Sequence, residues 1–122
     1  MPGTALAATP GVPVGLAATP GDREVVLTWS PVTAVPVVSD YLVQYSVDLG
    51  TTWIGIAHTV STVPYRSVTS LTNGVAYRFR IMAVNSEGIG PVSAVVTAVP
   101  FVVHTANDPA TFSACPAGAI PV

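Results

Sequence analysis

Residues 71–85 read LTNGVAYRFRIMAVN, and this stretch decides the fold. After the turn TNG, large apolar side chains alternate with residues that suit a solvated face. The inward set is Tyr77, Phe79, Ile81 and Ala83, and the outward set is Arg78, Arg80 and Met82. A period of two over this length is typical of a β-strand with one buried and one wet face. We therefore predict a core strand over 76–84, on which the rest of the fold packs.

Six other short segments have strand character, and Pro, Gly or Asp residues punctuate the gaps between them. They are residues 14–19, 24–29, 40–47, 52–57, 65–69 and 92–99. In the segment 40–47, the alternation places Tyr41 and Val43 on the inward face. No helical period competes. Seven short strands at intervals of roughly 8–12 residues predict an all-β, antiparallel, immunoglobulin-like sandwich with Greek-key connections.

The length of 122 residues suits one domain with tails. The motif LAATPG occurs twice, at 6–11 and 16–21, and only the second copy falls in a predicted strand. Prolines favour an extended path in the first copy. We predict a linker over 1–12, a domain over 13–99 and an extended Pro/Ala-rich tail over 100–122.

Composition excludes several classes of partner. Four arginines oppose six acidic residues for a formal net charge of −2, so no basic footprint for nucleic acid is present. No apolar run reaches the ~18–20 residues that span a bilayer, and no signal-peptide pattern opens the sequence, so membrane insertion is not expected.

Charged residues are only 8% of the chain, against roughly 25% in an average soluble domain. This scarcity predicts that apolar surface is buried against copies of the chain or neighbouring domains.

No catalytic, metal or cofactor site is predicted. The carboxylates are scattered, and His58 and His104 are too far apart in sequence for a zinc-binding motif. No serine lies in a Gly-x-Ser-x-Gly elbow. The lone Cys115 is either an incidental thiol or the partner of a cysteine on another chain. A contact patch is the remaining candidate: Trp53, Arg78 and Arg80 are expected on one sheet face, where they either pack on one another or contact carbohydrate or protein.

Three blocks carry a family resemblance: PVGLAATPGDREVVLTW (13–29), DYLVQYSVDLGTTW (40–53) and LTNGVAYRFRIMAVNSEGIGPVS (71–93). They resemble a fibronectin type III domain. The resemblance implies two sheets, A-B-E and C-C′-F-G, with Trp29 as the core tryptophan. It also implies a tyrosine corner, in which the Tyr77 hydroxyl bonds backbone near Leu71.

The resemblance is to the type found in bacterial extracellular and cell-surface proteins. The tail sequence FSACPAGAIPV (112–122) weakly resembles the run-in to an S-layer homology module. The expected function is non-catalytic: spacing, adhesion or self-assembly through apolar surface and tails. The alternative is an accessory module of a secreted polysaccharide-degrading enzyme, with a spacer or weak carbohydrate-contact role. The loop at 85–90 lacks the Arg-Gly-Asp tripeptide, so integrin binding is not implied.

Overall fold

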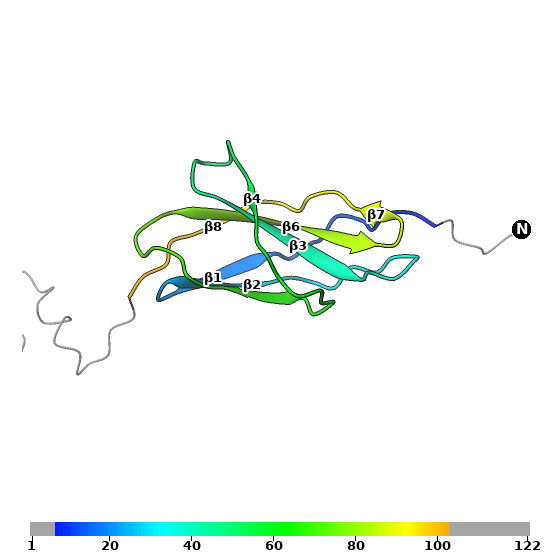
Figure 1. The fold of residues 1–122 in the computed structure, drawn as a ribbon, viewed down its shortest axis with the longest axis horizontal. Helices are drawn as coiled ribbons and strands as arrows, with labels where there is room; N and C mark the ends of the chain where they lie inside the picture. The colour runs from blue at the N-terminus through cyan, green and yellow to red at the C-terminus, as the bar shows by residue number, and fades with distance from the viewer. Residues whose placement is uncertain (1–6, 103–122) are drawn as a thin grey trace, which may run out of the picture.

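A computed structural model describes residues 7–102. Its strands form two antiparallel sheets (Figure 1). The first sheet has the order β1-β2-β5, with β1 at Ala17–Gly21, β2 at Glu24–Thr28 and β5 at Tyr65–Val68. The second contains β4 (Ile54–Gly55), β3 (Asp40–Ser46) and β6 (Tyr77–Asn85), and both β7 (Gly88–Ile89) and β8 (Val96–Ala98) pair with β6. The predicted all-β sandwich, with A-B-E opposite C-C′-F-G, is confirmed.

Strand β6 is the centre of the larger sheet. Its nine residues alternate strictly between buried and half-buried positions. It pairs with β3 from Asp40↔Val84 to Ser46↔Arg78. Because opposite residues of an antiparallel pair share a face, this register puts the apolar faces of both strands into the core.

The core lies between the two sheets and contains all seven residues expected there. None is more than 8% exposed; they are Trp29, Tyr41, Val43, Leu71, Tyr77, Phe79 and Ile81. The ring centroids of Trp29 and Tyr41 lie 5.1 Å apart in an edge-to-face arrangement. Aromatic pairs with this geometry contribute stability beyond their buried area.

The last predicted strand differs from the structure. Residues 92–99 were expected to form it, but only Val96–Ala98 do, and the predicted loop after β6 contains β7. Gly88 has φ 133°, which favours glycine and permits the tight turn back onto β6. From Ile89 to Val96 is seven residues, whereas the paired positions on β6 are five apart, so the strand bulges.

A serine stabilises this bulge. Ile81 N–H donates to the Ser93 hydroxyl at 2.9 Å, and Ser93 N–H donates to the Ile81 carbonyl at 2.8 Å. Pro91 has no N–H to contribute to the ladder. Two other strands also differ from their predicted bounds. The strand predicted at 14–19 is β1 at Ala17–Gly21, and Gly15, which lies before it, has φ 73°. The strand predicted at 52–57 is only the two residues of β4.

Segments beside the predicted domain boundaries contact the domain. In the predicted linker, Ala8 N–H donates to Val35 O at 3.1 Å, and Pro10 is fully buried. In the predicted tail, Gly74 N–H donates to Pro100 O, and Phe101 N–H donates to Gly21 O, both at 2.9 Å. The boundaries at 13 and 99 stay predictions, and the remainder of both tails, with Cys115, lies outside the described residues.

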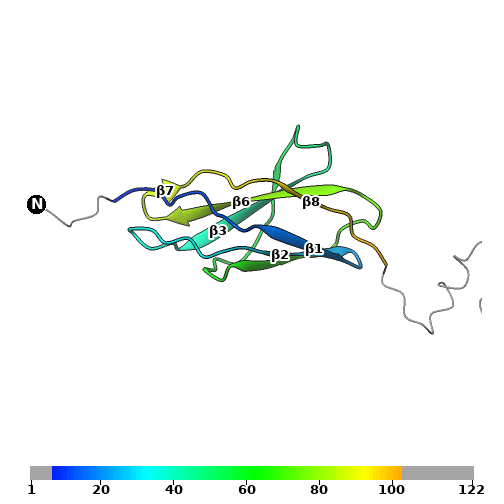
Figure 2. The same ribbon diagram turned by 180° about the vertical axis from the view of Figure 1, so that it is seen from behind.

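The described chain ends lie at opposite ends of the long axis (Figure 1). The same view from behind shows the N-terminal segment beside β7 and the orange C-terminal segment leaving at the far end (Figure 2). Residues 7–102 consist of strands and loops, so this part of the chain holds no helix able to cross a membrane.

Candidate functional site

The outer face of the larger sheet carries the predicted contact patch. The Arg80 Cζ atom lies 4.1 Å from the centroid of the Trp53 ring. Arg80 Nε donates at 2.7 Å to Oε1 of Gln44, its cross-strand neighbour on β3. A guanidinium over an indole face is a cation–π arrangement, and the Gln44 bond fixes its position. The structure thus brings together Trp53 and Arg80 as one packed unit.

Arg78 joins this unit from the side. Its Nη1 donates to Leu49 O at 3.2 Å, and its Nε is buried with no hydrogen-bond partner among the described residues. A Cβ at Gly50 would lie 3.6 Å from Trp53 Cζ2 and 3.9 Å from Arg78 Nη1. Trp53 and Arg78 therefore both lie beside Gly50, while Arg80 stacks on the Trp53 ring. We name Trp53, Arg78 and Arg80 the Trp–Arg patch.

A polar turn between β3 and β4 holds Trp53 in place. The buried Ser46 hydroxyl donates to Asp48 Oδ1 at 2.7 Å, and Thr52 N–H donates to the same oxygen at 2.8 Å. Gly50 N–H in turn donates to Ser46 Oγ at 2.9 Å. The bonds from the Ser46 hydroxyl and the Thr52 N–H lower the pKa of Asp48 to about 2. This turn fixes the start of β4, so the indole is pre-positioned.

The Trp–Arg patch is better suited to binding a ligand by stacking than to catalysing a reaction. An indole offers a flat apolar face to a sugar ring or an apolar side chain, and guanidinium groups recognise carboxylates. Arg80 already covers one face of the half-buried Trp53 ring. The patch holds no carboxylate, thiol or imidazole that would act on a substrate.

A second polar cluster, which the sequence did not reveal, lies between β3 and the crossover at residues 57–64. His58 Nε2 is 2.8 Å from Asp40 Oδ2, and both side chains are nearly buried at 12% and 13% exposure. Ser61 N–H donates to Asp40 Oδ1 at 3.1 Å. Partial burial raises the pKa of Asp40, but the bonds from His58, Ser61 and the Tyr41 backbone outweigh it and hold the pKa below its usual 3.8.

Arg66 joins this cluster from the other sheet. It is paired with Leu27 across β2, so its side chain starts on the core face of β5. Its Nη2 reaches Tyr41 O on β3 at 3.2 Å, while Nη1 is buried without a partner among residues 7–102. Burial lowers the pKa of Arg66, and the nearby Asp40 charge partly offsets this. Arg66 therefore links the two sheets at their flank.

The Asp40–His58 pair is not arranged for catalysis. His58 Nδ1 lies 3.1 Å from Ile56 O, so both ring nitrogens are already in hydrogen bonds. A general base needs a free nitrogen within reach of a substrate proton. Within residues 7–102, no three His, Cys, Asp or Glu side chains are grouped to hold a metal ion.

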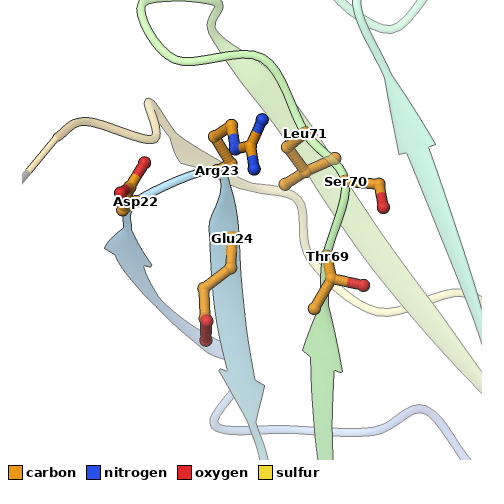
Figure 3. Close-up of a pocket in the computed structure, with 6 residues that line it drawn as sticks. All are labelled: Asp22, Arg23, Glu24, Thr69, Ser70 and Leu71. Carbon is orange, nitrogen blue, oxygen red and sulfur yellow. The ribbon is translucent and has the colours of Figure 1, made fainter.

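A polar notch of about 430 Å³ lies where the β1–β2 turn meets the end of β5. It is lined by Asp22, Arg23, Glu24, Thr69, Ser70 and Leu71 (Figure 3). Asn73 joins the two loops: Arg23 N–H donates to its Oδ1 at 2.8 Å, and its Nδ2 donates to Asp22 at 2.9 Å. In Figure 3 the polar side chains point in different directions, so no common binding point is formed.

Comparison with known proteins agrees with this architecture. The model of the fibronectin type III domain matches residues 11–99. A crystal structure of titin domains superimposes with a TM-score of 0.69 at 21% identity, over 78% of this chain and 33% of that one. The chicken CNTN1 FN1–FN3 structure superimposes with a TM-score of 0.67 at 27% identity, over 77% of this chain and 33% of that one. The FN3tt structure superimposes with a TM-score of 0.65 at 24% identity, over 77% of this chain and 97% of that one.

The chain spans 33% of the titin and chicken structures that it matches. Fibronectin type III domains are generally non-catalytic structural and interaction modules, and their fold does not by itself define a ligand. Two sheets with this strand order, the Tyr77 corner and the match over 11–99 lead to one conclusion. The chain belongs to the fibronectin type III family.

Proposed function

We propose that this domain is a spacer and assembly module of a bacterial extracellular or cell-surface protein, contacting neighbouring domains or copies of itself. The observation that carries the proposal is the path of the chain. It enters beside β7 and leaves beyond the β1–β2 turn, at the opposite end of the long axis (Figure 1). Both terminal segments are held against the domain, through contacts of Ala8, Pro10 and Phe101. A domain with its two chain ends at opposite ends of its long axis keeps the domains before and after it apart, as a spacer does.

Exposed apolar side chains favour contacts with other protein. Along the β7–β8 edge, Ile89, Val92, Val95 and Val99 are between 39% and 56% exposed. Isolated soluble domains keep such apolar patches small and surround them with charge. With 8% charged residues, this chain has few charges with which to do so. The C-terminal resemblance to the run-in of an S-layer homology module adds weight to a cell-surface location.

Light scattering of the purified chain, with and without reductant, tests the proposal. Large uniform particles that survive reductant support assembly through apolar surface. A dimer that dissociates in reductant places Cys115 at the contact. A monomer in both conditions rules out self-assembly and leaves the spacer role, which protease clipping of both tails would then support.

A second candidate function rests on the Trp–Arg patch. A half-buried tryptophan beside two arginines suits weak contact with carbohydrate, as in an accessory module of a secreted polysaccharide-degrading enzyme. The test is quenching of tryptophan fluorescence by added polysaccharide. Quenching that is present in the parent and lost in Trp53→Ala supports this role. The buried Trp29 remains in that variant as an internal reference, and quenching that persists there excludes the patch.

A further inference from the structure

The Asp40–His58 cluster fixes the connection between the two sheets. Residues 57–64 carry the chain from β4 in one sheet to β5 in the other. Two contacts hold this crossover to β3: His58 Nε2 to the Asp40 carboxylate at 2.8 Å, and Ser61 N–H to the same carboxylate at 3.1 Å. Among residues 7–102, His58–Asp40 is the single close contact between a basic and an acidic side chain, and it is an ion pair when His58 is protonated. The crossover therefore depends on the charge state of this pair.

The partners of His58 define the protonation state that fits. Nε2 faces a carboxylate and Nδ1 faces the Ile56 carbonyl, 3.1 Å away. Both groups only accept hydrogen bonds, so each ring nitrogen must carry a hydrogen to bond its partner. The imidazolium ring carries both hydrogens, whereas either neutral tautomer leaves one nitrogen lone pair facing an oxygen.

The charged and polar groups around His58 come from three elements. Asp40 on β3 attracts the imidazolium directly, and Arg66 on β5 faces Asp40 from the opposite sheet. Arg66 Nη2 is tied to Tyr41 O at 3.2 Å, so it supports β3 but has no contact that replaces His58. On the crossover, the Ser61 hydroxyl accepts from Val63 N–H at 3.1 Å and so lies within its own loop.

We propose that His58 is a pH-operated clasp: protonated, it holds the crossover at residues 57–64 against β3, and loss of its proton releases that hold. The clasp contributes stability while the ring is charged, because only the charged ring donates to both acceptors, and this contribution is lost when the ring loses its proton. At acid pH the clasp persists until Asp40 itself is protonated. The hydrogen bonds to Asp40 hold the pKa of its carboxyl below the usual 3.8. The crossover is thus held most firmly in mildly acidic solution, and Val60 and Val63, which are 70% and 55% exposed, lie on the part released.

Two measurements on the full chain test this inference. Nitrogen-15 spectra of the His58 ring report directly whether both nitrogens are protonated. The amide protection factor of Ser61 reports whether the crossover is held to Asp40. We expect an imidazolium ring at about pH 5, and a fall of about tenfold in Ser61 protection by about pH 8, the size expected for loss of a charge-assisted bond.

His58→Gln removes the titrating ring, and His104→Gln, at the other histidine of the chain, is the matched control. The fall in protection should persist in His104→Gln and vanish in His58→Gln. The same fall in His58→Gln, or unchanged protection in the parent, would overturn the proposal. If His58→Gln does not fold, the ring spectra of the parent decide, since a neutral ring at about pH 5 contradicts the clasp.

Discussion

The hydroxyl of Tyr77 accepts a hydrogen bond from the backbone N–H of Thr72 at 2.9 Å, so the first residue of β6 fixes the loop before it. Tyr77 is only 6% exposed. Replacing it with phenylalanine keeps the ring but leaves the Thr72 N–H without its partner. We expect Tyr77→Phe to lower the free energy of unfolding by about 1 kcal/mol or more, measured by urea denaturation. Tyr65→Phe is the control because Tyr65 is 49% exposed; equal stability of the two variants would contradict a structural role for this bond.

The fold was predictable because its periodic signals are local in sequence. The alternation from Tyr77 to Ala83 predicted both the existence of β6 and the side of it that is buried. Strand ends were less predictable, since they depend on contacts made across the sheet. The bulge before β8, for example, depends on the Ser93 hydroxyl accepting the Ile81 N–H, and no local pattern in the sequence announces such a bond.

The candidate site was predictable in part, for the same reason. Strand alternation places Arg80 on the outer face, and Trp53 is expected beside it from its position in the predicted strand 52–57; the two side chains lie together in the structure. The Asp40–His58 cluster was missed because its members are 18 residues apart and are joined by a loop rather than a strand. The only available signal was a lone histidine at a strand end, which does not specify a partner.

Pro10 and Gly90 are in direct backbone contact, which makes Gly90 a test of how firmly the N-terminal segment is held. A Cβ at Gly90 would lie 2.2 Å from Pro10 O, too close for the backbone to accommodate without moving. We expect Gly90→Ala to reduce the free energy of unfolding by about 1–3 kcal/mol, as overpacking does. Thermal unfolding measures this, and loss of amide protection at Ala8 would show the segment leaving.

Gly55→Ala is the matched control for this substitution. Nothing lies within 4 Å of a Cβ built at Gly55, and glycine inside a strand carries an entropic cost that alanine removes. The control should therefore be as stable as the parent or slightly more so. If Gly90→Ala behaves in the same way, the N-terminal segment is not packed against β6 and β7 as the structure has it.

Arg80 and Trp53 are stacked on the outer face of the larger sheet, and Arg80→Gln removes the cation from that pair. The loss should be modest, about 0.5–1 kcal/mol, because the pair is only partly buried. Trp53 fluorescence should shift to longer wavelength as water reaches the indole face that Arg80 covers. Arg80→Lys keeps the charge and should shift less; an unchanged spectrum in Arg80→Gln would show that the indole is covered by something else.

Asp48 gives the turn before Trp53 an acid limit. Its pKa is lowered to about 2 by the bonds from the Ser46 hydroxyl and the Thr52 N–H. Because the folded-state pKa lies below the usual 3.8, the turn is stabilised fully above that value and loses this contribution as pH falls through about 2. The amide chemical shift of Thr52 should therefore titrate near about 2 in the parent. It should stay flat in Asp48→Asn, whose amide oxygen accepts the Thr52 bond at every pH. A midpoint near 3.8 in the parent would show that the carboxylate bonds are not formed in solution.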